Sequence, residues 1–290
     1  GPDDEPTEQQ ALGLTALWPP TPAELEQALV QAQETAVAVG ITRVGEMGGY
    51  RALETYVALS ERGGLRIDVE LFIPPDRMET AVALRERGAF AGPRLRLGGV
   101  KLYTDGSVGA RTAALRAPYA DTPSRGELLY AEDQLCAELR RCLEADLRVA
   151  IHAIGDAAIL QVIEQVERLR SEGQKVAGRV RMEHAEMIDE PMLDRALDLG
   201  IDLSMQPNFM AQWSGRGGLY ERALGRERTL ALNPLRSVWD RDLALLFGSD
   251  GMPMDPAVGL RGAVHHPNEA QRLTAEEALR AYLGARSAPG

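Results

Sequence analysis

Short strand-like segments alternate with longer helix-like segments along most of this 290-residue chain. The alternation limits the fold more than any other feature of the sequence, because strands joined by helical crossovers lie side by side in a parallel sheet. The sequence predicts strands at 41–46, 66–73, 99–104, 148–154, 179–185, 201–206 and 243–249. It predicts helices at 21–39, 50–62, 76–88, 131–147, 156–172, 189–199, 234–240, 256–264 and 274–286.

A parallel α/β sheet is either open and doubly wound or closed into a barrel. No Gly-x-Gly-x-x-Gly follows the first predicted strand, so a dinucleotide-binding open sheet lacks its phosphate loop. A TIM-type (β/α)8 barrel needs one strand more than those predicted, and the first predicted element is a helix that opens at Thr21. We therefore expect an α/β barrel domain over 21–290 whose first strand lies upstream of the sequence. Residues 1–20 are expected to be a flexible tail or a tag remnant.

Composition and charge exclude several classes of function. The 43 acidic and 32 basic residues give a net charge of -11, which repels nucleic acid and anionic membrane surfaces. The apolar runs are far shorter than the roughly 20 residues that span a bilayer. Cys136 and Cys142 are expected to be free thiols, because their spacing turns them to different sides of one helix. We therefore expect a cytoplasmic protein that acts on a small molecule.

Four polar residues follow apolar strand segments: Lys101, His152, His184 and Asp250. In a parallel barrel all strands end at one face, so these side chains are expected to converge there, as active-site residues do. A single histidine at a strand end is most often an ordinary hydrogen-bonded side chain. Here two of the four histidines hold equivalent places in successive strand–helix units, which favours a shared metal ion. The other two, His265 and His266, lie in a polar loop and are expected to be exposed to solvent.

Lys101 is unusual because nearly all of the 32 basic residues are arginines. A lysine at the inner end of a strand needs a carboxylate partner, for which Asp105 is available, or else it is chemically modified. It can form a Schiff base or a metal-bridging carbamate, and an arginine can form neither. The residues alone leave these three alternatives open.

The longest segment without a predicted helix or strand is 105–130, directly after a strand. Its glycines and prolines favour an ordered functional loop over the face where the strands end. Arg111 in this loop, together with Gln206 and Asn208 after a later strand, could contact substrate. Each could equally stabilise its own loop.

Five motifs, in order along the chain, make it resemble a known family. They are Val-Lys-Leu-Tyr-Thr-Asp-Gly-Ser from Val100, Ile-His-Ala-Ile-Gly-Asp from Ile151, Arg-Met-Glu-His-Ala-Glu from Arg181, Met-Gln-Pro from Met205 and Phe-Gly-Ser-Asp-Gly-Met-Pro from Phe247. Over 21–286 the chain resembles the amidohydrolase superfamily. Within it, the chain is similar to the YtcJ-like branch, which includes the N-substituted formamide deformylases.

The resemblance implies a (β/α)8 barrel that binds one or two divalent ions, usually zinc. It implies that Lys101 can be carboxylated to bridge the ions and that His152 and His184 are metal ligands. It also implies that Asp250 contacts the metal site and activates the hydrolytic water. The expected reaction is hydrolysis of a C–N bond in a small amide or N-acyl substrate.

The sequence departs from the family at its start. The family's first strand ends in His-x-His, which holds the first ion, and no His-x-His occurs in this sequence. This polypeptide by itself is therefore expected to be weakly active or inactive. The alternatives are a catalytically inactive barrel remnant and a Schiff-base lyase that uses Lys101 as nucleophile. A barrel without its first strand has an open seam, which we expect residues 11–20 or association into a homo-oligomer to cover.

Overall fold

The computed structural model describes residues 19–47 and 52–284. At its centre is a sheet of seven parallel strands, each paired with the next one along the chain. The strands are β1 Arg43–Glu46, β2 Asp68–Ile73, β3 Leu95–Tyr103, β4 Arg148–Ala153, β5 Val180–His184, β6 Asp202–Met205 and β7 Leu245–Phe247. Every strand predicted from the sequence is therefore confirmed, with some shift at the ends.

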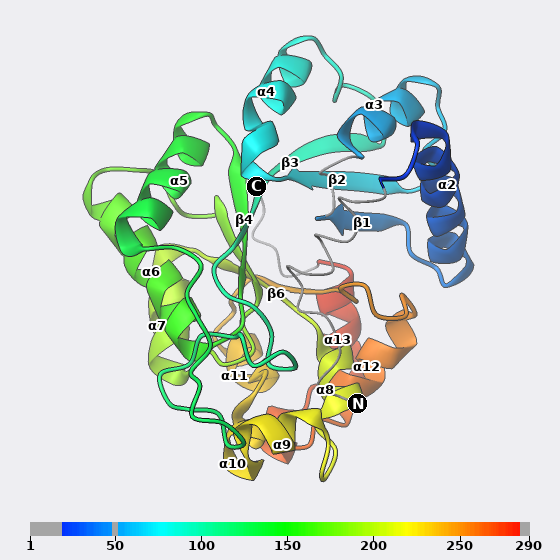
Figure 1. Cartoon of the computed structure of the whole chain (residues 1–290). Coiled ribbons are helices and arrows are strands. Elements are labelled where there is room, and N and C mark those ends of the chain that lie inside the picture. The colour runs from blue at the N-terminus through cyan, green and yellow to red at the C-terminus, as the bar shows by residue number, and fades with distance from the viewer. Residues whose placement is uncertain (1–18, 48–51, 285–290) are drawn as a thin grey trace.

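Helices connect the strands and surround the sheet (Figure 1). The predicted helices are α2 Pro22–Ala38, α3 Leu53–Glu61, α4 Met78–Glu86, α5 Glu132–Glu144, α6 Asp156–Ser171, α7 Glu190–Leu199, α11 Leu235–Asp240, α12 Pro256–Val264 and α13 Ala275–Tyr282. The helices α8 Pro207–Trp213, α9 Leu219–Leu224 and α10 Arg226–Ala231 lie where the sequence predicts no element. Short 3-10 turns occur at η2 Pro75–Arg77 and η3 Glu269–Gln271.

The helix ends follow local sequence signals. Thr21 accepts a hydrogen bond from the Glu24 amide through its hydroxyl, and the Glu24 carboxylate accepts one from the Thr21 amide, which closes a capping box at the start of α2. Thr274 and Glu277 form the same box at the start of α13. Gly200 ends α7 in the left-handed conformation, with φ 65°.

Ion pairs across the inner face of the sheet show that it is strongly curled. Arg148 of β4 reaches Glu70 of β2 at 3.1 Å and Asp202 of β6 at 3.0 Å. Arg181 of β5 lies 3.7 Å from Glu70, although three strand spacings in a flat sheet amount to about 14 Å. The seven strands therefore form a curled half-barrel. A further strand upstream of the sequence stays a prediction.

The main apolar core lies between the outer face of the sheet and the helices. From α6, side chains at helical spacing are fully buried against it, among them Ile159, Val162, Ile163 and Val166. A second apolar cluster lies apart from this core and joins the 105–130 loop to α8, α9 and Leu232 just after α10. It covers the end of the half-barrel where the strands finish.

One expectation about exposure is wrong. His266 is fully buried, and its ring nitrogens each lie 3.1 Å from a backbone carbonyl, that of Asn268 and that of Leu232. The polar loop folds inward because both ring nitrogens find partners: Nε2 donates to the Leu232 carbonyl, and Nδ1 accepts from the backbone amide of Asn268 at 3.1 Å. His265 beside it is exposed, as expected.

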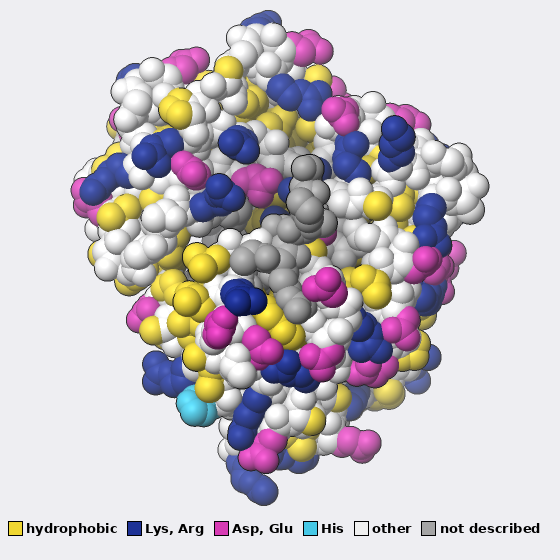
Figure 2. All heavy atoms as spheres, turned by 180° about the vertical axis from the view of Figure 1, so that it is seen from behind, with side chains coloured by type: hydrophobic (Ala, Val, Ile, Leu, Met, Phe, Trp, Pro, Cys, Tyr) yellow, Lys and Arg dark blue, Asp and Glu magenta, His cyan; other side chains and the backbone are white. Residues whose placement is uncertain are grey.

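The two cysteines are free thiols, as expected, although the helix that carries them buries both. Basic and acidic side chains are interspersed over the surface (Figure 2). None of the described helices is long and apolar enough to cross a membrane. Residues 11–18, expected to help cover an open seam, lie outside the described part of the chain.

Candidate metal centre and catalytic site

Four residues predicted from the sequence meet where the strands end. Lys101 lies in β3, His152 in β4, His184 at the end of β5 and Asp250 just after β7. The rings of His152 and His184 stand edge to face, with centroids 4.5 Å apart. Nε2 of His184 lies 3.9 Å from Oδ2 of Asp250. The structure therefore brings together side chains from four parts of the sequence.

The protonation of the His152 ring follows from its neighbours. Nε2 of His152 lies 3.0 Å from the carbonyl oxygen of Gly106 and 3.5 Å from Oδ1 of Asp105. Both neighbours are acceptors, so Nε2 carries the hydrogen and donates it. The lone pair of the ring then lies on Nδ1, which can bind a metal ion.

His184 is fixed in the same manner by another oxygen. Its Nδ1 lies 2.7 Å from Oε1 of Gln206, which can only accept. The Gln206 amide is held in this orientation because its Nε2 donates to the carbonyl of Ser204 at 3.4 Å. Nδ1 of His184 is therefore the donor, and its Nε2, on the side of Asp250, keeps the lone pair.

Both histidines are neutral at physiological pH. Burial, together with the positive charge of Lys101, lowers the pKa of His184 to about 4. Burial also holds the pKa of His152 well below its ordinary value, with added effects of His184 and Lys101. Neutral imidazole is the form that binds metal ions.

Lys101 lies near a buried carboxylate that is itself paired with an arginine. Its side chain is buried, and Nζ lies 4.8 Å from the centre of the Tyr103 ring. Burial opposes ionisation of the neighbouring Glu183, but Arg181 and Lys101 outweigh it and hold the pKa of Glu183 below its usual value. Nε of Arg181 donates to Oε1 of Glu183 at 2.6 Å. Lys101 thus has an ionised carboxylate close below it.

Uncommon backbone conformations place these side chains. A bulge in β3 shifts its register against β2, and at this bulge Gly99 has φ 149°. A Cβ on Gly99 would lie 2.0 Å from the carbonyl oxygen of Arg148, so no other residue fits there. His184 and Asp250 adopt left-handed backbone angles, with φ 70° and 47°. Such strain in non-glycine residues is concentrated at functional sites.

The two histidines fit a divalent metal ion as a pair of neutral nitrogen ligands. Each ring has one nitrogen fixed by an oxygen acceptor, as metal-binding histidines usually do, and the other nitrogen free. In the described part of the chain, no three His, Cys, Asp or Glu side chains stand together as a ready metal-binding group. The donor set of His152 and His184 therefore fits a divalent ion.

The 105–130 loop is ordered by Asp105. Its carboxylate accepts hydrogen bonds from the backbone amides of Ala114, Ile154 and Gly155, at 2.9, 3.1 and 2.8 Å. One buried side chain thus ties the loop to the end of β4 and the start of α6. The ordered loop expected from the sequence is found, and Asp105 helps to form the site by contacting His152.

The three residues expected at the substrate have different places. Arg111 donates to both carboxylate oxygens of Asp121 and to carbonyls of its own loop, so it stabilises the loop. Asn208 is buried and donates to the carbonyl of Ser249 at 3.0 Å, next to Asp250. Gln206 orients His184. Only Gln206 contacts a residue of the candidate site directly.

Sequence reasoning missed one buried acid near the site. Burial raises the pKa of Glu186 to about 7, although hydrogen-bonding side chains of Tyr220 and Asn233 partly oppose this effect. Glu186 is the last residue of the motif that contains His184. An acidic residue in that motif was the available signal. Its neighbours Tyr220, in α9, and Asn233 come from a part of the chain where the sequence predicted no element.

Comparison with known proteins identifies the family of the chain. The profile of the amidohydrolase family matches residues 5–285. The chain is 31% identical over 205 residues to YtcJ of Bacillus subtilis (strain 168), a protein assigned to the amidohydrolases, covering 66% of this chain and 38% of YtcJ. It is 27% identical over 275 residues to the N-substituted formamide deformylase of Arthrobacter pascens, covering 85% of this chain and 48% of that enzyme.

A solved structure has the same fold. An uncharacterised metal-dependent hydrolase from Pyrococcus furiosus superposes with a TM-score of 0.84 at 29% identity, covering 96% of this chain and 58% of the other. The curled parallel half-barrel of this chain is thus a fold found in a known metal-dependent hydrolase. The chain belongs to the amidohydrolase family, in the YtcJ-like branch. It spans about half the length, or less, of the curated relatives it matches.

Proposed function

We propose that this chain is a metal-dependent hydrolase that acts on C–N bonds of small amide or N-acyl substrates. The observation that carries the proposal is the pair of buried, neutral histidines, each with one ring nitrogen left free, that of His184 lying 3.9 Å from Asp250. Membership of the amidohydrolase family supports the reaction class. The similarity to an N-substituted formamide deformylase supports an N-acyl substrate.

Zinc is the proposed ion, because neutral imidazole nitrogens are common zinc ligands. His152 and His184 would hold it, with Asp250 and a carboxylated Lys101 as further ligands. A divalent ion supplies Lewis acidity, which lowers the pKa of water to roughly 7 and polarises a carbonyl group. The charge of Lys101 and the burial of both rings keep the histidines neutral before any ion binds.

Asp250 is the proposed general base. Its side chain is 53% exposed, so solvent and substrate can reach the carboxylate. Desolvation raises its pKa above the ordinary value, while Lys101 and His152 oppose this effect. The carboxylate takes a proton from the attacking water and passes it to the leaving nitrogen. Asn208 holds the backbone next to it through the Ser249 carbonyl.

The second apolar cluster is the proposed wall for the acyl or amine substituent. The Phe209 ring stacks beside His184 at a centroid distance of 6.0 Å, and Trp213 packs on Phe209 at 4.7 Å. Starting from His184, the rings of Phe209 and Trp213 follow one another along α8. An apolar substituent would pack there while its C–N bond lies at the strand ends.

The test is release of free amine from N-acyl amines by the zinc-loaded chain. We expect a rate above background but below that of longer relatives, and a loss of roughly 100-fold in Asp250→Asn, since a general base contributes about that much or more. The exposed pair of Asp198 and Arg170 is remote from the site, so Asp198→Asn is the matched control. Zinc binding without any amine release would contradict the hydrolase and favour an inactive barrel. Borohydride trapping of a carbonyl substrate on Lys101 would favour a Schiff-base lyase.

A further inference from the structure

A basic pocket of about 480 Å³ lies away from the candidate metal centre. It is formed between α8, the loop after it, the start of α10 and the end of α12. The basic side chains that line it are Arg216, Arg226, Arg261 and His265, and none of its lining residues in the described chain is acidic. The lining of this pocket is basic, although the whole chain carries a net charge of -11.

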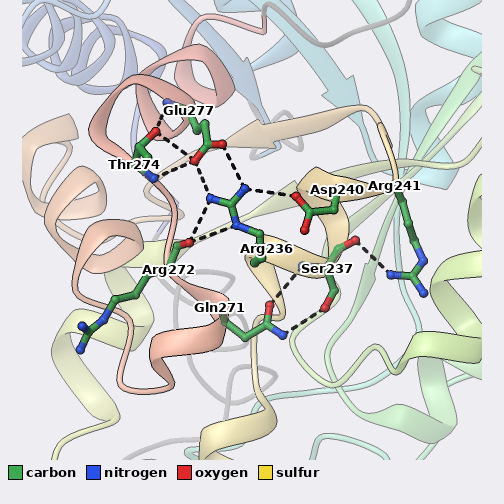
Figure 3. Close-up of polar contacts among 8 residues, drawn as sticks. All are labelled: Arg236, Ser237, Asp240, Arg241, Gln271, Arg272, Thr274 and Glu277. Carbon is green, nitrogen blue, oxygen red and sulfur yellow. Dashed lines mark hydrogen bonds and ion pairs between the residues drawn. The ribbon is translucent and has the colours of Figure 1, made fainter.

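The positive charges of this pocket are poorly neutralised. Arg216 and Arg261 are exposed, and neither guanidinium has an ion pair or hydrogen bond with another described residue. The carboxylate nearest to Arg226 is that of Glu221, 3.8 Å from its Nε. By contrast, Arg236 elsewhere on the surface binds two carboxylates and a carbonyl (Figure 3). The pocket therefore holds guanidinium groups that are free to bind an external anion.

The chemistry of the wall indicates the class of ligand. Guanidinium groups present parallel N–H donors that match the oxygens of a carboxylate or a phosphate. Met210 and Pro267 add apolar surface beside them. We propose that this pocket binds the phosphate or carboxylate group of a small anionic molecule.

The pocket has a rigid base and is distinct from the proposed metal site. The helices α8 and α12 pack so closely that a Cβ on Gly262 would lie 2.0 Å from the carbonyl oxygen of Pro207. Gln206, at the start of α8, contacts His184, whereas Met210 and Ser214 farther along α8 line the pocket. The anion pocket does not rest on the proposed hydrolase function, because none of the proposed metal ligands lines it.

The test is calorimetric titration of the intact chain with inorganic phosphate and, separately, with succinate at low ionic strength. We expect saturable binding of at least one of them, weakened roughly tenfold or more in the double variant Arg216→Gln/Arg261→Gln. Arg87→Gln is the matched control, because Arg87 is an exposed arginine at the end of α4, far from the pocket in sequence and outside its lining. Phosphate and succinate compared in the same variants show which oxyanion the pocket prefers.

Three outcomes would overturn the proposal. The first is absence of saturable binding of both anions to the unchanged chain. The second is equal weakening in Arg87→Gln and in the double variant, which would mean a general charge effect. The third is loss of binding in His152→Ala/His184→Ala with no loss in the double arginine variant, which would place the anion at the metal site. The single variants Arg216→Gln and Arg261→Gln, checked by thermal melting, keep the test decisive if the double variant is unstable.

Discussion

At the scale of single residues, the site depends on oxygen acceptors that fix two imidazole rings. Gln206 decides which nitrogen of His184 is free, and the Gly106 carbonyl does the same for His152. Such partners orient a ligand before the metal arrives, so their loss reduces affinity without removing a ligand.

Replacing Gln206 tests this dependence. Gln206→Leu should weaken zinc binding by about 10- to 100-fold, because Nδ1 of His184 loses its acceptor. Gln206→Glu keeps an oxygen acceptor and should retain most of the affinity. The measurement is competition for zinc against a chromophoric chelator. Unchanged affinity in Gln206→Leu would show that the hydrogen bond does not orient the ring.

The sequence predicted which residues meet but not how they are oriented. Lys101, His152, His184 and Asp250 could be found because parallel strands all end on one face. The free nitrogens could not be found, because they depend on Gly106 and Gln206, which are remote in sequence from the histidines they contact.

At the scale of elements, one buried carboxylate ties the loop between β3 and α5 to the end of β4 and the start of α6. Asp105→Ala would leave buried backbone amides of Ala114, Ile154 and Gly155 without their acceptor. An unsatisfied buried donor costs about 1–3 kcal/mol, so the free energy of unfolding should fall by about 3 kcal/mol or more. Urea denaturation measures the change.

A matched control is available in the same loop. Asp121→Ala removes the exposed partner of Arg111 and should change the free energy of unfolding by less than about 1 kcal/mol. If Asp105→Ala costs no more than Asp121→Ala, the three amide hydrogen bonds do not order the loop.

The link between α11 and α13 predicts a pH dependence of stability. Arg236 donates to both oxygens of Glu277 (Figure 3), and this interaction, with help from Thr274, lowers the pKa of Glu277 from 4.5 to about 2. A carboxyl with a lowered pKa stabilises the folded state above the unfolded pKa. This stabilisation is fully present above pH 4.5 and is lost as the pH falls toward 2.

Glu277→Gln keeps the capping geometry at Thr274 and removes the charge. At pH 7 it should lower the free energy of unfolding by about 1 kcal/mol, a modest value because the pair is partly exposed to solvent. The difference from the unchanged chain should shrink between pH 4.5 and 2, as urea denaturation at several pH values would show. Glu276→Gln, in an exposed pair with Arg280, should change little at any pH. A difference that is constant with pH would contradict the role of the Glu277 charge.

Periodicity explains which elements the sequence could predict. Long helices such as α6 have buried residues at helical spacing, and the strands are apolar runs bounded by turns. The helices α8, α9 and α10 have only 7, 6 and 6 residues. Helices this short are not stable alone and depend on tertiary packing, which for α8 and α9 is the second apolar cluster. No local pattern could reveal that packing.

At the scale of the whole molecule, the half-barrel has two edges. In the described chain β1 pairs only with β2, and β7 pairs only with β6. Exposed strand edges readily pair with other strands, so natural proteins cover them. We expect that residues before Thr21 cover the edges or that two copies associate across them, burying on the order of 1,000 Å² or more.

Light scattering of the chain and of a version that starts at Thr21 separates these outcomes. Covering by the N-terminal residues predicts a monomer that is less stable, or that associates, when they are removed. Association predicts a dimer or larger oligomer in both versions. A monodisperse monomer whose stability does not change on removal would contradict both.

The most direct measurement for the central claim is the zinc content of the purified chain and its histidine variants. We predict about one equivalent of zinc per chain, lost in His152→Ala/His184→Ala and reduced in each single variant. His265→Ala is the matched control, because His265 is exposed and lies outside the candidate site, and its zinc content should equal that of the unchanged chain. Equal zinc in the unchanged chain and in His152→Ala/His184→Ala, with both folded by circular dichroism, would contradict the account.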